Sequence, residues 1–501
     1  MRVAPRAARL PSTAMTNTSV LATDAYKFSM AQAGFPLRRE TFYFSFRFGG
    51  FHYIPFDLAE TLRSMTEGLR ATAEDLAFAR AHGYGPSAAM ESALGEGEAL
   101  QIEAVPAGSW VYEREPILTV TGPSFLVSWL EPTLLWLNFP IQLATALKQG
   151  AGLTPEMTRA TCAEHEAIIA SVVESLGMTG KVEITREDDA YRQGVRDRAR
   201  SLVEAVGGDA SRIFEVGMRS AVCMEQHRIA LEACKAEGIT RTSNVLLARE
   251  LDMTPVGTMG HEHVQRWRAD LPAFRAMRDM RSAAPSYLLD TFDTMGEGIR
   301  AAAKVMREQE HACSIRYDSG NKFVQYLHAC ELLREQGLAP AHVLEDGLDD
   351  EATHHFERLR EFTGLSAQSQ HYGYGGFIVA KPMGNPLSRD RVSAVYKLSE
   401  TVGEPCMKFG DAAGRGKRSV PGRPVVWRRL RGGGPLGIIG QAGEAVPEDY
   451  VCLSNNPDAI EQLRICNVLD LSRAMTIPQP QRRVELSDAT ASLVERLTHS
   501  P

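Results

Sequence analysis

The residue types that can carry out chemistry gather where short apolar runs of the chain end. Between residues 213 and 376, polar or glycine-rich turns follow one such run after another. In parallel α/β folds the functional residues collect at the carboxyl ends of the strands, so we expect these turns to form one site. The turns are Gly217-Met218-Arg219, Thr242-Ser243-Asn244, 257–263, Asp290-Thr291-Phe292-Asp293, 316–321, 345–349 and Gly373-Tyr374-Gly375-Gly376.

Several of these groups favour phosphate. Asp346-Gly347 and Gly375-Gly376 can expose backbone N–H groups to a phosphate. Arg219 and Arg316 can bind anions through two N–H groups at once. Neither glycine pair belongs to a P-loop, which needs G-x-x-x-x-G-K-[ST]. Taken singly, each glycine is better explained as ordinary turn chemistry, and only the repeated pattern indicates a site.

The remaining groups favour a sugar and a group transfer. His261 offers a nucleophilic or acid–base imidazole. With His263 it also forms half of a zinc motif, but no third ligand follows at metal spacing. Asp-Ser-Gly at 318–320 has the alternative of starting a helix as its N-cap. Carboxylates that can bind Mg²⁺ or ribose hydroxyls are Asp290, Asp293, Asp318 and Asp349. Phosphate, diol and small anion together indicate sugar-phosphate transfer.

The elements that must position these groups alternate between strand and helix at a spacing of about 30 residues. This alternation predicts a parallel sheet with crossover helices, and its length favours a barrel-like sheet. The predicted strands are Ile213–Val216, 239–241, Pro255-Val256, Ser286–Leu289, Cys313–Tyr317, His342–Leu344 and, less clearly, Phe377–Ala380.

The two ends of the chain have a different pattern. Thr23-Asp24 is a predicted helix N-cap, and a long apolar helix is predicted over 125–148. Strands are predicted at Thr41–Phe48, 101–105 and 117–120, and again at 392–398, 407–408 and 425–427. The remaining predicted helices cover 56–94, 155–207 and the last 25 residues.

Composition limits the class of protein. The 501 residues are 44% hydrophobic and carry a formal charge of −7, which is typical of a globular protein and argues against nucleic acid as a partner. No apolar run is long enough to predict a membrane span. The eight cysteines form no C-x-x-C pair, so we expect a reducing compartment, the cytoplasm. Seven basic residues and no acid occupy 415–431, which predicts a local anion-binding surface or a solvated loop.

The sequence resembles the nicotinate phosphoribosyltransferase family, which is related to nicotinamide phosphoribosyltransferase. The motifs run in the family's order from about residue 20 to 430. They are Thr23-Asp24-Ala25-Tyr26 with Met30, Gly217-Met218-Arg219, Thr242-Ser243-Asn244, 257–262, 290–294, 316–320, Val395-Tyr396-Lys397-Leu398 and Pro421-Gly422.

The resemblance implies a fold and its domains. The fold class would be α/β, an irregular TIM-like (β/α) barrel of the type II phosphoribosyltransferases with a second α/β domain built from both chain ends. The barrel would cover 146–390, with a helical insertion near 150–207. The second domain would combine 21–145 with 391–475, and 1–20 and 476–501 would be tails, the first of them disordered.

The resemblance also implies a reaction. Nicotinate and phosphoribosyl pyrophosphate would give nicotinate mononucleotide and pyrophosphate, with Mg²⁺ and coupled ATP hydrolysis. The implied catalytic residues are His261, as a phosphohistidine, Asp290, which would orient it, and Asp318. The implied substrate-binding residues are Tyr26, Arg219, Ser243, Arg316, Asp346, Gly347, Gly375 and Gly376. Tyr26 would stack on the pyridine in a neighbouring subunit's site, which implies a homodimer with shared active sites.

Two alternatives stay open. Ser243 can donate a hydrogen bond to a carboxylate, where the nicotinamide enzymes have an Asp, and this favours nicotinate. Tyr26-Lys27, Ser319-Gly320-Asn321 and Gly375-Gly376 are closer to the nicotinamide enzymes. Val216 stands where both enzymes usually have Phe, so an aromatic wall is lost unless Phe214 replaces it. The alternatives are therefore transfer to nicotinamide or another pyridine, and a non-catalytic ligand-binding protein.

Overall fold

The computed structural model describes residues 19–150, 153–281, 285–309, 311–381, 384, 386–408, 418–466 and 484–499. Residues 1–18 of the predicted N-terminal tail, and 476–483 and 500–501 of the predicted C-terminal tail, lie outside this part of the chain. Residues 409–417, which include the start of the basic stretch, also lie outside it.

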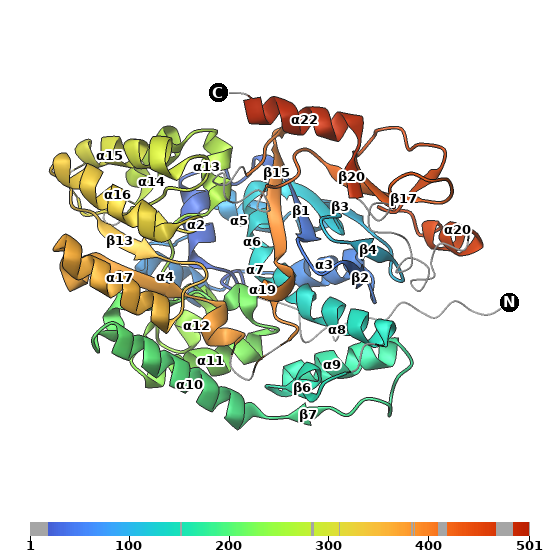
Figure 1. The fold of residues 1–501 in the computed structure, drawn as a ribbon, viewed down its shortest axis with the longest axis horizontal. Coiled ribbons are helices and arrows are strands. Elements are labelled where there is room, and N and C mark those ends of the chain that lie inside the picture. The colour runs from blue at the N-terminus through green and yellow to red at the C-terminus, as the bar shows by residue number, and fades with distance from the viewer. Residues whose placement is uncertain are drawn as a thin grey trace.

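The middle of the chain forms a sheet of seven parallel strands (Figure 1). The strands pair in the order β10-β9-β8-β14-β13-β12-β11, and β10 and β11 form its two edges. The sheet is therefore a curled, incomplete barrel, which confirms the predicted fold class and shows where the barrel is open. The strands are β8 (Ile213–Glu215), β9 (Arg241–Thr242), β10 (Thr254–Pro255), β11 (Ser286–Leu288), β12 (Ser314–Tyr317), β13 (Ala341–Leu344) and β14 (Gln370–Tyr374).

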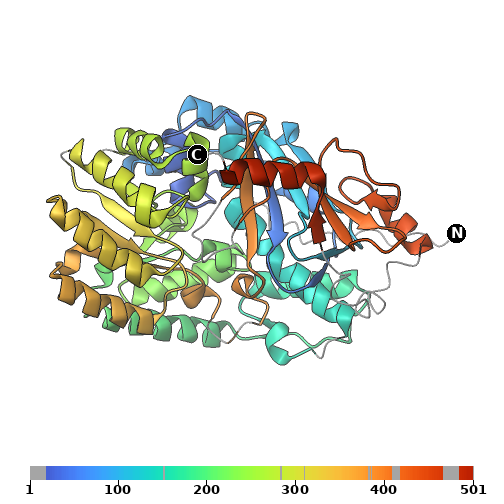
Figure 2. The ribbon, with the colours of Figure 1, turned by 45° about the horizontal axis from the view of Figure 1, so that its top comes forward.

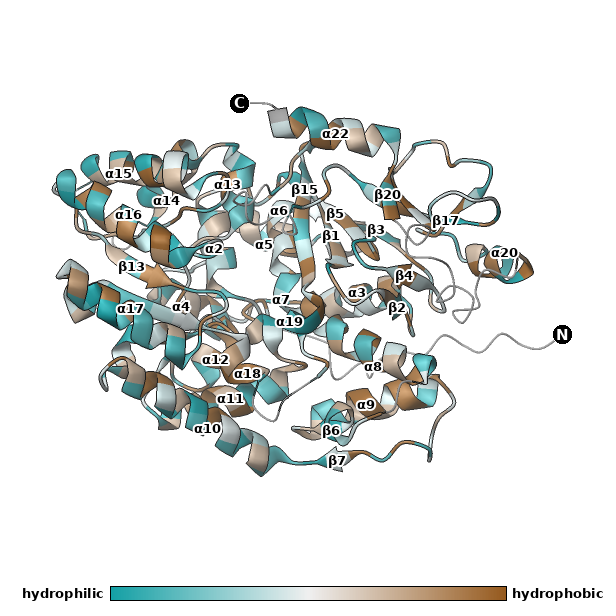
Figure 3. Cartoon of the chain, viewed as in Figure 1, coloured by the Kyte–Doolittle hydropathy of each residue, from teal (hydrophilic) through white to brown (hydrophobic). Residues whose placement is uncertain are grey.

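Crossover helices cover the outside of this sheet. Strands β8, β11, β12 and β13 are buried along most of their length, as expected of strands enclosed on both faces. In Figure 3 strand β13 is hydrophobic, whereas helix α17 outside it is mostly hydrophilic. The helices are α11 (Met224–Ala236), α12 (Val245–Glu250), α13 (His261–Trp267), α14 (Asp270–Met280), α15 (Ile299–Arg307), α16 (Lys322–Glu335), α17 (Asp350–Thr363) and α18 (Gly376–Val379).

A second sheet joins the two ends of the chain. It has five strands in the order β16-β15-β1-β5-β3, with antiparallel pairing. Strands β1 (Arg39–Phe46), β3 (Gln101–Ala104) and β5 (Leu118–Pro123) precede the parallel sheet in the sequence, whereas β15 (Ala394–Thr401) and β16 (Glu404–Pro405) follow it. The second α/β domain is therefore built from N- and C-terminal segments, as predicted. The exact domain boundaries stay a prediction.

Helices and small sheets complete the molecule. Helix α22 (Asp488–His499) packs on β18 and β20 (Figure 2). The N-terminal and insertion helices are α2 (Ala25–Gln32), α3 (Leu58–Thr66), α4 (Ala73–Ala81), α5 (Ala88–Leu94), α6 (Ser124–Trp129), α7 (Glu131–Leu134), α8 (Asn138–Gln149), α9 (Ala163–Ser175) and α10 (Asp188–Ala205). The remaining elements are β2 (Phe51–Tyr53), β4 (Trp110–Tyr112), β6 (Arg159–Ala160), β7 (Thr185–Arg186), α19 (Arg389–Val392), β17 (Pro424–Arg429), β18 (Gly437–Gln441), β19 (Tyr450–Cys452), α20 (Ala459–Ile465) and β20 (Val484–Leu486).

Three predicted elements differ from the structure. The run at 377–380 belongs to helix α18, and the strand before it is β14; a short apolar run has no period that separates strand from helix. The predicted long helix is divided into α6, α7 and α8, with Pro132 in the first turn of α7. Met407-Lys408 is not a strand. In the described part of the chain, no helix is both long and apolar enough to span a membrane.

Candidate functional site

A cavity of about 460 Å³ opens at the carboxyl ends of the parallel strands, where the second sheet faces them. Its charged lining comes from both chain ends and from the barrel. The lining cations are Arg47, Arg219, Arg316, Lys381, Arg389, Lys397 and Lys408, and the lining acids are Glu131, Glu262, Asp318, Glu345, Asp346 and Asp390. We call this space the outer cavity.

A second cavity of about 300 Å³ continues inward among the parallel strands. Apolar side chains such as Phe214, Val256 and Val343 contribute to its lining, together with Ser243. We call it the inner cavity. The residues that line both cavities, and so mark their junction, are Tyr26, Val216, Arg219, Arg316 and Glu345.

His261 is the first residue of helix α13 and faces the outer cavity. Its Nδ1 lies 3.1 Å from Thr291 Oγ1, and its Nε2 lies 3.2 Å from Asp318 Oδ2 and 2.6 Å from Lys408 Nζ. Burial and the neighbouring Lys408 ammonium lower the pKa of His261, so the ring is neutral at pH 7. When Lys408 donates to Nε2, the ring proton remains on Nδ1 and is donated to Thr291. In this tautomer the imidazole is neutral and its Nε2 carries no proton.

Asp290 lies beside this histidine at the end of β11. Its Oδ1 is 3.8 Å from His261 Nε2, and its Oδ2 is 3.7 Å from Lys408 Nζ. Ser319 donates its hydroxyl to Oδ2. Oδ1 is buried with no hydrogen-bond partner among the described residues. The closest polar neighbours of the imidazole are thus Thr291, Asp318 and Lys408. Asp290 is more distant, at 3.8 Å from Nε2.

Arg316 is held by two carboxylates. Its Nη2 lies 2.5 Å from Asp318 Oδ1 and 3.1 Å from Glu345 Oε2. Its Nη1 donates to Thr258 Oγ1 at 2.8 Å and to the Met259 carbonyl at 3.0 Å. Although burial opposes ionisation, the Arg316 guanidinium holds the pKa of Asp318 well below its ordinary value. Asp318 therefore stays a carboxylate between Arg316 and His261.

The helix caps separate functional from structural acids. Asn321 caps helix α16 by accepting from Val324 N, so Asp318 and Ser319 are not used as caps. Asp349, in contrast, caps helix α17 by accepting from Ala352 N. The helix-start alternative therefore does not account for Asp318, whereas Asp349 has a capping role that the sequence analysis did not assign to it.

Tyr26 lies in the cavities of its own chain. The first turn of α2 enters between the strand ends, and a Cβ at Gly257 would lie 2.4 Å from Tyr26 N. Tyr26 donates its hydroxyl to Glu131 Oε2 at 3.1 Å, and Arg219 Cζ lies 5.7 Å from the centre of its ring. Tyr26 thus lines both cavities of the chain that carries it, and its expected role in a neighbouring subunit's site stays a prediction.

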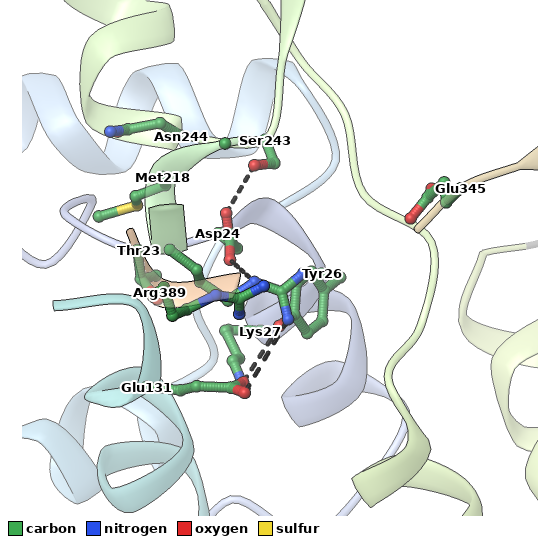
Figure 4. Close-up of polar contacts among 12 residues, drawn as sticks. Thr23, Asp24, Tyr26, Lys27, Glu131, Met218, Ser243, Asn244, Glu345 and Arg389 are labelled. Carbon is green, nitrogen blue, oxygen red and sulfur yellow. Dashed lines mark hydrogen bonds and ion pairs between the residues drawn. The ribbon is translucent and has the colours of Figure 1, made fainter. Parts of the chain in front are cut away.

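Ser243 is occupied by Asp24 (Figure 4). Its hydroxyl donates to Asp24 Oδ1 at 2.6 Å, and Asp24 Oδ2 lies 3.5 Å from Arg219 Nε. Asp24 stands at the predicted N-cap position of α2, but its side chain makes no cap hydrogen bond. The donor that the sequence assigned to a substrate carboxylate is therefore already used within the protein.

A buried ionic network lies next to Tyr26 and includes Lys27, Glu131 and Glu262. Lys27 Nζ lies 2.5 Å from Glu131 Oε2 and 2.9 Å from Glu262 Oε1 (Figure 4 shows the first pair). Glu131 also lies 3.9 Å from Arg219 Nη1 and 3.9 Å from Lys397 Nζ. Helices α2 and α7 and strand β15 are thus tied together at the cavity wall.

The two predicted phosphate-binding turns differ in backbone conformation and in the space around their glycines. Asp346 and Gly347 both have left-handed backbones, with φ of 60° and 65°, and a Cβ on Gly347 would meet open space. A Cβ on Gly376 would instead lie 2.3 Å from Asp390 Oδ2. All four predicted turn residues, Asp346, Gly347, Gly375 and Gly376, line the outer cavity.

The site has a donor set that fits one divalent cation. His261, Asp290 and Asp318 place ligand atoms within 4.8 Å of one another. The buried, unpartnered Oδ1 of Asp290 fits Mg²⁺, which prefers carboxylate oxygen. His263 is not part of this group, because its Nε2 bonds to the Ala273 carbonyl at 2.9 Å. The zinc half-site is therefore not formed.

The basic stretch at 415–431 does not supply the cavity's cations from its described residues. Arg423 pairs with Glu103 at 3.0 Å, Arg428 with Glu115 at 2.5 Å and Arg431 with Asp449 at 2.7 Å. Arg415 and Lys417 lie outside the described residues. The positive charge around the cavity comes instead from residues scattered over the chain, which no local run of basic residues could reveal.

The structure also brings in residues that the site prediction did not include. Lys408, Glu131, Lys397 and Glu345 line the outer cavity beside the predicted residues. Lys408 contacts His261 although 147 positions separate them in the sequence, whereas Lys397 belongs to one of the motifs that carry the resemblance. Glu345 was visible as the residue after a predicted strand, and this position was the available signal.

The aromatic side chain that could replace the one missing at Val216 is Phe214, which lies deeper in the site. Phe214 and Val216 both line the inner cavity, and Val216 also reaches the junction. Residues 214 and 216 share a face of the strand because side chains alternate. Phe214 thus lies on the correct face, one pleat deeper than Val216.

Comparisons with known proteins agree with this fold. No family model matches the chain. The nicotinate phosphoribosyltransferase of Bacillus subtilis (strain 168) is 25% identical over 268 residues, covering 52% of this chain and 50% of that protein. That of Bordetella pertussis is 25% identical over 419 residues, covering 79% and 91%. The chain spans about half the length of the first curated relatives it matches.

A solved structure shows the same fold. The crystal structure of nicotinate phosphoribosyltransferase from Porphyromonas gingivalis superposes with a TM-score of 0.57 at 18% identity, covering 80% of this chain and 95% of that one. The curated relatives agree with the resemblance of the ordered motifs to nicotinate phosphoribosyltransferases, and the solved structure shows the same fold.

Proposed function

We propose that the protein is a nicotinate phosphoribosyltransferase, which joins nicotinate to phosphoribosyl pyrophosphate with coupled ATP hydrolysis. One observation carries the proposal: a neutral, nucleophilic His261 lies in a cation-lined cavity, next to Asp318, Lys408 and Arg316. The family of the chain supports the same reaction.

In this proposal His261 accepts the γ-phosphoryl group of ATP. A P–N bond to the neutral imidazole forms as the P–O bond to ADP breaks, and water later cleaves the P–N bond, which releases phosphate and restores the imidazole. Lys408 stabilises the negative charge near Nε2, and the hydrogen bond from Nδ1 to Thr291 keeps the ring oriented. In the transfer itself, the base nitrogen bonds to the anomeric carbon as pyrophosphate leaves. The cations of the outer cavity stabilise that leaving group.

Mg²⁺ would be held by Asp290 and Asp318 together with the substrate phosphates, and when bound it neutralises the pyrophosphate. The backbone at Asp346-Gly347 would receive the 5′-phosphate, since this left-handed turn lines the outer cavity and a Cβ on Gly347 would meet open space. Tyr26 and Phe214 would border the pyridine at the junction and in the inner cavity.

A homodimer and a cytoplasmic location remain proposals. Because Tyr26 lines its own chain's site, one subunit contains every predicted site residue. All eight cysteines are free thiols, which agrees with a reducing compartment. Sedimentation of the purified protein measures the oligomeric state, and activity of a monomeric fraction would exclude an obligatory shared site.

One assay tests the reaction. The purified protein is given phosphoribosyl pyrophosphate and Mg²⁺ with nicotinate or nicotinamide, each with and without ATP, and mononucleotide is measured. We expect nicotinate mononucleotide, with more formed when ATP is present. Mononucleotide from nicotinamide alone would contradict the proposal and indicate transfer to nicotinamide instead. No product from either base would support the non-catalytic alternative.

Transfer to nicotinamide is the second candidate, and one observation favours it. Ser243 donates to Asp24, and Arg316 is paired with Asp318 and Glu345, so two groups suited to a carboxylate are already engaged. An amide offers N–H donors to such carboxylates. The curated relatives named above favour nicotinate, and the assay decides between the two bases.

A further inference from the structure

The junction of the two cavities holds two cations that a ring substituent can meet, Arg219 and Arg316. Arg316 has already used both of its terminal nitrogens. Nη1 donates to Thr258 and to the Met259 carbonyl, and Nη2 faces Asp318 and Glu345. The cluster of Arg316 with these two carboxylates has a formal charge of −1. A ring carboxylate entering the junction therefore meets a negative cluster rather than a spare guanidinium.

Glu345 is built into this cluster. It follows strand β13, is 5% exposed, and places Oε2 3.1 Å from Arg316 Nη2. The neighbouring strand β14 has Gly373 at the same level. A Cβ on Gly373 would lie 2.7 Å from Glu345 Cγ and 2.8 Å from the Phe214 ring, so the glycine makes the room that the acid occupies. Asp318, the other acid, is engaged with His261 on the phosphate side.

We propose that Glu345 sets the base selectivity of the site, because its carboxylate cancels the charge of Arg316 and weakens binding of a pyridine carboxylate relative to the uncharged carboxamide. This inference rests on the proposed function and names the residue that tunes its substrate preference. Burial raises the pKa of Glu345, and the neighbouring Arg316 guanidinium opposes this and favours the carboxylate. The charge of a buried carboxylate is screened less than that of a surface acid. Arg219, whose side chain is 25% exposed and also faces Asp24 and Glu131, is the other cation at the junction.

The test is the ratio of two dissociation constants. Binding of nicotinate and of nicotinamide is measured by calorimetry on the whole protein and on Glu345→Gln, which keeps the shape and removes the charge. We expect the nicotinate Kd to fall by on the order of tenfold, with nicotinamide changed by less than about twofold. An unchanged ratio, or a shift toward nicotinamide, would overturn the proposal.

Three further variants separate charge from packing. Glu345→Asp keeps the charge and should keep the original ratio, and a ratio like that of Glu345→Gln would overturn the proposal. Glu345→Ser removes the same charge with a smaller side chain, and carries the test if the Gln variant does not fold. Glu115→Gln is the matched control: it neutralises an equally buried carboxylate paired with Arg428, away from both cavities, and should leave the ratio unchanged.

Mononucleotide formation by the unsubstituted protein is measured in parallel. Its absence would contradict the proposed function, while the ratio of binding constants would still support or overturn the role of Glu345. A protein that forms mononucleotide but shows the same ratio in Glu345→Gln would keep its function and lose this inference.

Discussion

The outer and inner cavities are built in opposite ways. The outer cavity combines charged residues from distant parts of the chain, such as Arg47 on the N-terminal side, His261 in the barrel and Lys408 near the C-terminus. The inner cavity is lined largely by residues of the parallel sheet and its adjoining turns, and several of them are apolar. The two cavities therefore have different roles in the proposed reaction. Group transfer would depend on bringing the two sheets together, whereas base binding would depend largely on the parallel sheet.

The largest expected effect is on the outer cavity alone. His261→Ala removes the proposed phosphoryl acceptor, so stimulation of the reaction by ATP should be abolished. Binding of the base, measured by calorimetry, should change by less than about threefold, because the imidazole faces the outer cavity. His354→Ala, an exposed histidine on α17, is the control and should keep full stimulation. Stimulation that survives in His261→Ala would contradict the assigned role.

Lys408→Met is expected to have the next largest effect. The ammonium lies 2.6 Å from His261 Nε2 and 3.7 Å from Asp290, in the position where phosphoryl charge would develop. Loss of one such charge should lower kcat by about a hundredfold while base binding stays within about twofold. Lys304→Met on α15, an exposed lysine, is the matched control. A variant that loses base affinity and keeps kcat would show that the two cavities are not separate in function.

The sequence predicted the barrel side of the site better than the side that the second sheet contributes. The turns after predicted strands contain Arg219, Ser243 and Asp318, because parallel strands place their carboxyl ends together wherever the helices lie. Lys408 was not predicted, since a lone lysine carries no periodic or spacing signal. Its position depends on pairing between β1 and β15, which are more than 340 residues apart in the sequence.

Side-chain partners were less predictable than positions. Asp24 was predicted as an N-cap, and nothing in its neighbourhood indicated that it would accept from Ser243 instead. Asp318 and Asp349 both precede predicted helices, yet Asp349 caps α17, whereas α16 is capped by Asn321. Local preference allows an acid in either role, and tertiary contacts decide between them.

A smaller, pH-dependent effect is expected from Lys397. Burial lowers the pKa of Lys397 to about 8, against the opposing influence of Glu131 and with that of Arg47, Lys408 and Arg219. The side chain is therefore charged below pH 8 and loses its charge as the pH rises through 8. Because a neutral amine attracts pyrophosphate less, the KM for phosphoribosyl pyrophosphate should rise severalfold between pH 7 and pH 9, with the KM for the base unchanged.

Lys397→Arg sharpens this measurement, because a guanidinium does not titrate in that range. The variant should show a flat KM for phosphoribosyl pyrophosphate between pH 7 and pH 9. A variant profile as steep as that of the unsubstituted protein would assign the titration to another group of the outer cavity.

The smallest expected effect concerns the inner cavity. Val216→Phe adds a ring at the junction, one pleat above Phe214, where a flat pyridine can be covered on one face. We expect both nicotinate and nicotinamide to bind severalfold more tightly, with the degree of ATP stimulation unchanged, because the added ring carries no charge toward His261. If both bases bind more weakly, Phe214 already forms the wall and the space beside Val216 belongs to the base. If ATP stimulation changes instead, the junction transmits the phosphorylation state of His261 to the base, and the separation between the two cavities is wrong.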